Sequence, residues 1–306
     1  MPISSLAEKL AQLEDAIAAA CRKASRSRGE VELMAVSKTY PASTIAEAAS
    51  LGLRLFGENR VQEFASKSPE LAALHHSVAH ADRELAHSVG QGLSPDKSDL
   101  QSAGTLQAAE NFGSEVGGGF NRRVSRNESV RASAPEVRFH LIGHLQSNKA
   151  ARAAELFDAI DSVDSLRLAE RLNETAAKLD KRLPILIEVK LSPEESKAGL
   201  EPDSAEAVAL FERLPNLEHL EMQGLMTIAP WGVAEDITRS CFRSLRTWRD
   251  KWATEHSRLT FEVLSMGMSG DFPLAIEEGA TRIRVGTALF GKRQPYTGPE
   301  SNTDPK

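Results

Sequence analysis

Short apolar segments recur along this chain, and most of them are separated by segments with helical periodicity. The pattern predicts strands at 31–38, 53–58, 137–143, 156–163, 183–191 and 259–267, a strand at the end of 217–228, and the last strand with its turn at 281–291. It predicts helices at 3–24, 41–52, 147–156, 165–180, 203–213, 235–253 and 272–279. Strands that alternate with helices form a parallel sheet. Eight such units favour a closed (β/α)₈ barrel, a fold that commonly takes about 250 residues.

A doubly wound open sheet is the alternative arrangement of the same elements. Dinucleotide-binding sheets of that type carry a Gly-x-Gly-x-x-Gly turn after the first strand. Here the first strand runs into Ser37, Lys38 and Thr39, with no glycine among them. The closed barrel is therefore the preferred prediction. It is expected to occupy residues 1–295 as one domain, with a flexible tail at 296–306.

Residues 66–134 interrupt the alternation between the second and third strands. The stretch contains no Ile, Met, Trp or Tyr, and it holds seven of the chain's 20 Gly. A segment with so few large apolar groups buries too little surface to offset the entropy of ordering it. We therefore predict a low-complexity, disordered insertion, in which residues 70–89 are compatible with one or two helices. Its histidines (His75, His76, His80 and His87) lack a Cys or carboxylate pattern to complete a ligand set, so no metal site is predicted.

Charge and cysteine content disfavour several classes of protein. Lys and Arg total 37 against 43 Asp and Glu, which gives a net charge of −6 at pH 7. A general nucleic-acid binder usually has a basic excess. No apolar run approaches the ~20 residues of a membrane span, and the N-terminal helix carries acidic residues that a secretory signal lacks. Cys21 and Cys241 cannot form a disulfide framework and fit a reducing cytoplasm.

Barrel enzymes place their chemistry at the carboxyl ends of the strands, so candidate site residues are expected there. These ends carry, in chain order, Lys38, Asn59, His140, Glu188, Lys190, Met226, Ser269, Arg284, Gly286 and Thr287. His140 and Met226 are candidates for lining a pocket, although a buried core histidine is an equal alternative for His140. Asp161 and Asp164 are interpreted as helix caps rather than as a catalytic pair.

Lys38 follows an apolar run, and two turns of small residues follow the last two strands. At the rim of an apolar barrel a lysine can lose solvation, which makes its amine a candidate Schiff-base nucleophile. A solvated lysine at a strand end is the alternative. Ser269 and Thr287 add hydroxyl donors to the turns after strands seven and eight, where barrels commonly bind phosphate.

An amine nucleophile beside a phosphate site suggests a phosphorylated aldehyde, and pyridoxal 5′-phosphate (PLP) is the common one. Arg284 then gains a possible role. Many PLP enzymes pair the pyridine nitrogen with an acid, whereas an arginine cannot accept that proton. An arginine there would leave the ring a poor electron sink. An ion pair at a strand end is the alternative for Arg284.

Seven motifs carry a resemblance to a known family. They are AVSKTYP, FGENRVQE, FHLIGHLQSNK, EVKLSPEESKAGL, GLMTI, LSMGMSGDFPLAIEEGAT and RVGTALFG. With these motifs, in this order, the chain resembles the YggS/PROSC family, the pyridoxal phosphate homeostasis proteins. The resemblance covers residues 1–65 and 136–292 and leaves out the insertion. It implies a single (β/α)₈ TIM barrel like the N-terminal domain of alanine racemase.

The resemblance also implies a cofactor and the residues that hold it. PLP would be bound as an aldimine on Lys38, the lysine of AVSK. Its phosphate would contact Ser269, Gly286 and Thr287, and Asn59 is the asparagine of the GEN motif.

The same resemblance implies that Arg284 would face the pyridine nitrogen. It also implies a function and partners. Members of the family bind, store or deliver PLP without an established catalytic reaction. The implied partners are PLP itself and apo-PLP enzymes as recipients, and the protein is expected to be a cytoplasmic monomer without nucleic-acid or membrane partners.

Two other functions stay open beside the PLP-binding homeostasis protein. A PLP-dependent racemase needs a second base on the opposite face of its substrate. Alanine racemase takes that base, a tyrosine, from a C-terminal β-domain. Few residues follow the last strand here, and the only tyrosines are Tyr40 and Tyr296. The third function is a Schiff-base aldolase without PLP. No residue is assigned a catalytic role.

Overall fold

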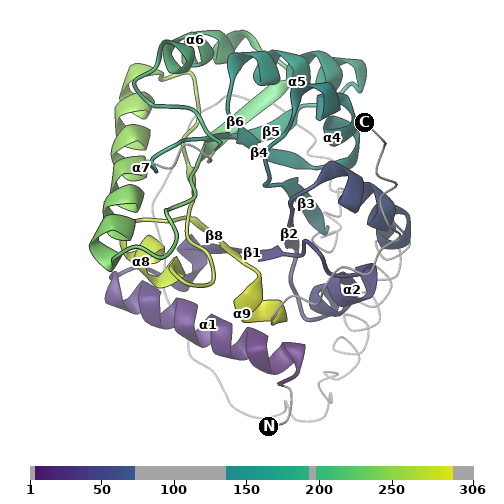
Figure 1. Cartoon of the computed structure of the whole chain (residues 1–306), viewed down its shortest axis with the longest axis vertical. Coiled ribbons are helices and arrows are strands. Elements are labelled where there is room, and N and C mark those ends of the chain that lie inside the picture. Colours follow the sequence, from purple (N-terminus) through teal and green to yellow (C-terminus); the bar gives the residue numbers. More distant parts are fainter. Residues whose placement is uncertain (1–3, 73–135, 193–197, 292–306) are drawn as a thin grey trace, which may run out of the picture. The chain divides into compact units, whose positions relative to one another are not determined.

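Eight parallel strands form a closed barrel in chain order, and the last strand pairs with the first (Figure 1). The computed structural model describes residues 4–72, 136–192 and 198–291. The strands are β1 (Glu32–Val36), β2 (Leu55–Glu58), β3 (Arg138–Leu141), β4 (Ala159–Val163), β5 (Leu183–Glu188), β6 (Leu220–Met226), β7 (Val263–Ser265) and β8 (Arg282–Val285). The predicted (β/α)₈ barrel is confirmed.

Helices surround the barrel (Figure 1). They are α1 (Leu6–Lys23), α2 (Ala42–Ser50), α4 (Ala150–Leu156), α5 (Leu166–Lys178), α6 (Ala205–Arg213), α7 (Glu235–Glu255), α8 (Phe272–Glu277) and α9 (Thr287–Phe290). Residues 61–72 are helical as well. Most of these helices connect one strand to the next, as parallel pairing requires.

Helix α1 shows how periodicity and capping produce these elements. Leu6, Leu13 and Ile17 recur at helical spacing, and the helix buries all three. At its start, the Ser5 hydroxyl accepts a hydrogen bond from the Glu8 N–H, and the Glu8 carboxylate accepts one from the Ser5 N–H. This capping box satisfies two backbone donors that have no partner within the helix. The helix packs against α8 and α9.

The segment 281–291, predicted as the last strand and its turn, contains a strand and a short helix. β8 ends at Val285, and Thr287–Phe290 form α9. Leu289 of α9 is fully buried, so its apolar side chain still belongs to the core. A short apolar run carries no period that separates a strand from a helix, so a turn rather than a helix was expected at these residues.

The helix at 61–72 extends into the segment predicted as an insertion. Lys67 and Leu71 are buried, so residues 66–72 belong to the barrel. Val61, Phe64 and Leu71 of this helix are buried together with the alkyl stem of Lys67, and only Val61 and Phe64 precede the predicted insertion. Residues 73–134 and 296–306, with the four insertion histidines, lie outside the described residues. The chain divides into two units, one of residues 1–78 with 135–306 and one of 79–134.

A row of charged side chains crosses the barrel interior. Asp161 of β4 lies 3.0 Å from the Nδ1 atom of His140 and 3.3 Å from Arg282, which donates to Glu32 of β1 at 2.8 Å. Burial alone would raise the pKa of Asp161, but His140 and the nearby arginines outweigh burial and lower it. Asp161 is therefore not the predicted helix cap. The side chain of Ser165 caps α5 instead.

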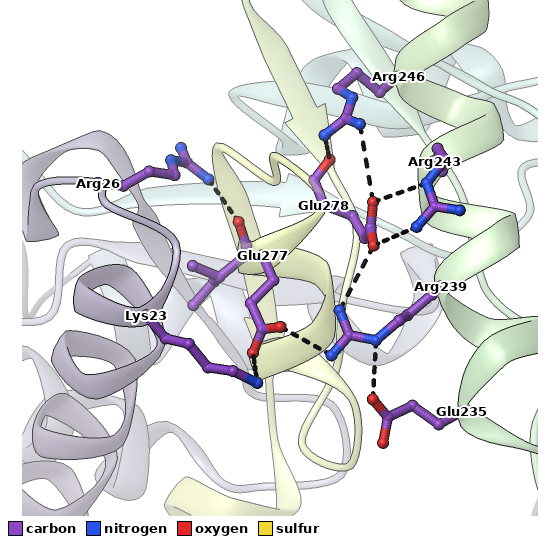
Figure 2. Close-up of polar contacts among 9 residues, drawn as sticks. Lys23, Arg26, Glu235, Arg239, Arg243, Arg246, Glu277 and Glu278 are labelled. Atoms are coloured by element: carbon purple, nitrogen blue, oxygen red, sulfur yellow. Dashed lines mark hydrogen bonds and ion pairs between the residues drawn. The ribbon is translucent and has the colours of Figure 1, made fainter.

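Ion pairs join α1, α7 and α8 on the outside of the barrel (Figure 2). Glu277 of α8 contacts Lys23 of α1 at 2.7 Å and Arg239 of α7 at 2.8 Å. The neighbouring Glu278 contacts three arginines of α7, which are Arg239, Arg243 and Arg246. These contacts hold the short helix α8 between its two neighbours.

In the part of the chain that the structure describes, no helix has both the length and the apolar character that a membrane crossing needs. No group of three or more His, Cys, Asp or Glu in it is arranged to hold a metal ion. Cys21 and Cys241 in it are both buried, and neither forms a disulfide.

Candidate functional site

A cleft of about 600 Å³ opens at the carboxyl ends of the strands. Its walls include residues that follow β1, β2, β3, β6 and β7, and residues at the end of β8. Of the eight residues predicted to bind PLP or to line its pocket, six line this cleft: Lys38, Asn59, Ser269, Arg284, Gly286 and Thr287. This is the end of the barrel at which enzymes of this fold hold their active sites.

Lys38 lies half-buried two residues after the end of β1. Both of its neighbours in the chain are held by carboxylates. The Ser37 hydroxyl donates to Glu58 at 2.7 Å, and the Thr39 N–H donates to Glu63 at 2.5 Å. Thr39 has a φ of 70°, a left-handed conformation that a β-branched residue seldom adopts. The fixed backbone on both sides of Lys38 limits where its amine can lie.

Lys67 ties these two carboxylates together. Its ammonium lies 2.7 Å from Glu63 and 3.3 Å from Glu58. Desolvation raises the pKa of Glu58, while Lys67 and the Ser37 hydroxyl oppose that shift. One buried cation thus partners both acids that hold the backbone next to Lys38. Sequence analysis missed this role, because Lys67 fell within the predicted insertion.

The turns after β7 and β8 meet at the far wall of the cleft. The Ser269 hydroxyl accepts a hydrogen bond from the Ala288 N–H at 3.2 Å, which links the two turns. Gly286 precedes α9, and Thr287 is exposed at its first position. Two hydroxyls among small residues leave backbone N–H groups accessible, and such donor sets suit an anion.

The turn after β7 is shaped by one glycine and one acid. Gly267 has a φ of 92°, and a Cβ atom there would lie 2.5 Å from the Cβ of Ala275. Only glycine therefore fits this turn. Asp271 also lines the cleft, and its carboxylate accepts the N–H of Met268. Burial raises the pKa of Asp271, while the Met268 N–H and the charge of Arg284 oppose that shift.

Arg284 reaches the cleft from β8 and is 4% exposed. Its guanidinium donates to the Ser265 carbonyl at 2.6 Å, to the Ser265 hydroxyl at 2.9 Å and to the Thr227 carbonyl at 2.8 Å. Burial lowers the pKa of Arg284, and nearby carboxylates oppose that shift. An arginine keeps its charge even so. The site therefore contains a fixed cation that cannot accept a proton.

The two other predicted residues, His140 and Met226, are not among those that line the cleft. His140 is buried beside Asp161 in the charged row across the barrel. Met226 is fully buried at the end of β6, where it pairs with Glu188. Side-chain direction alternates along a strand, so a position at a strand end does not decide whether a residue faces the cleft.

The loop after β6 supplies a wall that sequence analysis missed. Pro230, Trp231 and Val233 line the cleft, and Trp231 is 88% exposed at its mouth. A tryptophan shortly after the end of a barrel strand was the available signal, since loops at this end form the site.

Comparison with known proteins identifies the family of this chain. The model described as alanine racemase, N-terminal domain, matches residues 10–294. A pyridoxal phosphate homeostasis protein of Aquifex aeolicus is 32% identical over 287 residues, which cover 94% of this chain and 98% of the relative. Its counterpart in Escherichia coli K12 is 33% identical over 292 residues, with 95% and 98% covered. The chain belongs to the pyridoxal phosphate homeostasis protein family.

Solved structures with a similar fold support this family assignment. PipY of Synechococcus elongatus PCC7942, solved with PLP bound, has a TM-score of 0.67 and 36% identity, covering 94% of this chain and 100% of PipY. Alanine racemase of Clostridium difficile 630 has a TM-score of 0.57 and 12% identity, covering 91% of this chain and 55% of the racemase. The racemase shares the fold alone. The resemblance drawn from the seven motifs is confirmed.

Proposed function

We propose that the cleft binds PLP, and that the chain serves PLP homeostasis by holding and releasing the cofactor. The observation that carries this proposal is the set of groups in one cleft: the amine of Lys38, the guanidinium of Arg284 and the hydroxyls of Ser269 and Thr287. PLP presents an aldehyde, a pyridine nitrogen and a phosphate. The names of the relatives and the PLP in PipY support the same ligand.

Each group on the cofactor has a counterpart among the lining residues. Lys38 supplies the amine that binds the aldehyde covalently. Ser269 and Thr287 donate to the phosphate together with backbone N–H groups near Gly286, and Asn59 adds an amide to the wall. When bound, PLP supplies an electrophilic carbon and a ring that can draw electrons from it.

Arg284 favours storage over catalysis. An acid beside the pyridine nitrogen would keep that nitrogen protonated and the ring electron-withdrawing, whereas a guanidinium has no proton acceptor. Its donors to Ser265 and Thr227 hold Arg284 in place. Tyr40 follows closely after Lys38 in the chain rather than coming from a separate domain, and its hydroxyl donates to the Gly291 carbonyl at 2.9 Å. These contacts support a binding protein with a ring that is a weak electron sink.

The proposal extends to partners and location. Apo-PLP enzymes are the expected recipients, and the protein acts as a monomer in the cytoplasm. The net charge of −6 gives no support to a nucleic-acid partner.

Replacing the phosphate donors tests the proposal. Each charge-assisted hydrogen bond lost should weaken PLP binding by about 10- to 150-fold. We expect that loss in a Ser269→Ala/Thr287→Val variant titrated with PLP by visible absorption. Ser257→Ala, exposed after α7 at the opposite end of the barrel, is the control. Unchanged affinity in the double variant would refute the phosphate assignment, and a wild type that takes up no PLP would refute the proposed function.

A further inference from the structure

A second cavity, of about 270 Å³, adjoins the cleft, and we call it the side cavity. Asn59, Ile142 and Ile228 line both spaces. Pockets for drug-sized ligands usually measure about 300–1,000 Å³, so the side cavity suits a smaller molecule. A ligand in it would lie next to whatever the cleft holds.

Glu188, the last residue of β5, lines the side cavity. The residue is 4% exposed, and its Oε2 atom is buried without a hydrogen-bond partner in the described part of the chain. Buried polar groups in native proteins nearly always have a partner, and an exception calls for an explanation such as an absent ligand. The mechanism proposed for the cleft makes no use of this carboxyl group.

The backbone that carries Glu188 and Lys190 is held rigidly. The Leu200 N–H donates to the Glu188 carbonyl at 2.8 Å, and the Lys190 N–H donates to the Leu200 carbonyl at 2.9 Å. Gly199 has a φ of 126°, and a Cβ atom there would lie 2.8 Å from the Lys190 nitrogen. Only glycine permits this close approach. The two charged residues are therefore preorganised at the wall of the side cavity.

Lys190 has an ammonium group that can turn to a ligand. It lies 3.5 Å from the carboxylate of Glu201, whose side chain is 69% exposed. A contact of that length to an exposed partner is weak. Ile142, Leu191 and Ile228 give the same cavity an apolar wall. The side cavity thus combines a carboxyl group with one oxygen that has no hydrogen-bond partner, an available cation and an apolar surface.

From this arrangement we infer that the side cavity binds a small α-amino acid with an apolar side chain. The ammonium of the amino acid meets Glu188, its carboxylate meets Lys190, and its side chain contacts the apolar wall. A simple amine would leave Lys190 unused, and a keto acid would leave Glu188 unpaired. This inference rests on the proposed function in one respect, because PLP is taken as the ligand of the adjoining cleft.

L-Valine is the probe, titrated calorimetrically into the PLP-loaded protein after borohydride reduction. Reduction fixes the cofactor to the protein, so valine cannot exchange with it. Glu188→Gln should weaken valine binding by about 10- to 150-fold, since a charge-assisted hydrogen bond is lost. Lys190→Gln should weaken it as well. Glu218→Gln, exposed near the opposite end of the barrel, should leave it unchanged.

Two analogues of valine, each lacking one of its charged groups, serve as chemical controls. Isobutylamine and α-ketoisovalerate should both bind more weakly than valine. Absence of valine binding at millimolar concentration would overturn the inference, as would wild-type affinity in both variants. Visible absorption before reduction reports PLP uptake separately. If no PLP is taken up, the proposed function fails, and the valine titration of the unreduced protein still decides the inference.

Discussion

At the scale of single residues, Glu188 is held where its charged form is disfavoured. Desolvation raises its pKa to about 7, against the attraction of Arg284 and with a smaller contribution from Asp164. Lys190 and His144 also line the cavity around it. A glutamate in an unfolded chain titrates near pH 4.3. The folded protein thus holds this proton more tightly, and stability falls as the pH rises from about 4 to about 7.

Glu188→Gln should remove this pH dependence. Relative to the wild type, the variant should gain roughly 3 kcal/mol in free energy of unfolding between about pH 4 and pH 8, because glutamine cannot ionise. Urea unfolding at several pH values measures the difference, with Glu221→Gln, exposed on β6, as the control. A constant difference between variant and wild type across this range would contradict the account.

The sequence predicted where each strand ends, but it did not predict which side chains at those ends face the cleft. Lys38 and Ser269 could be predicted because each follows an apolar strand in a barrel whose chemistry lies at one end. His140 and Glu188 sit at strand ends too, but one pairs with Asp161 and the other has an unpartnered oxygen in a cavity. That difference depends on contacts with distant strands, which no local pattern contains.

At the scale of secondary structure elements, ion pairs fix α8 between α1 and α7 (Figure 2). Hydrogen bonds from Lys23 and Arg239 lower the pKa of Glu277, although partial burial opposes them. Because the folded pKa lies below the unfolded value, these pairs stabilise the fold at neutral pH. Their contribution is lost as the pH falls through the folded pKa.

Glu277→Gln should therefore destabilise the protein at pH 7 and much less in acid. We expect a loss of about 0.5–1 kcal/mol at neutral pH, discounted because the side chain of Lys23 is largely exposed. Thermal unfolding at both pH values measures it. Glu255→Gln, exposed at the end of α7, is the control and should show no such pH dependence. A loss that is equal in acid would mean that the ion pairs contribute nothing.

The elements that sequence periodicity missed were the short or polar ones. α9 has four residues, too few to display a helical period, and the helix at 61–72 buries Lys67 and Leu71 within a polar stretch. The eight strands were found because parallel strands are buried on both faces and appear as continuous apolar runs.

At the scale of the whole molecule, the barrel unit comprises residues 1–78 and 135–306. Replacing residues 79–134 with a short linker should leave PLP binding unchanged. Loop-closure entropy changes by about 0.6 kcal/mol per halving of the loop, so stability should shift by about 2 kcal/mol at most. Melting temperature and PLP titration measure both effects.

A longer deletion provides the matched control. Removing residues 66–134 would also take away Lys67 and Leu71, which are buried in the barrel. It should lower stability by several kcal/mol, because it exposes core and leaves Glu58 and Glu63 without their cation. If the shorter deletion aggregates or loses PLP, residues 79–134 contribute to the barrel or to its cofactor site.

Covalent capture of PLP tests whether Lys38 is the residue that holds the cofactor. Borohydride should fix PLP to its lysine in the whole protein, and mass mapping of the peptides then identifies that residue. We expect phosphopyridoxyl on Lys38 and no fixed label at any position of the cleft in a Lys38→Ala variant. A label found mainly on another lysine, with Lys38 unmodified, would contradict it.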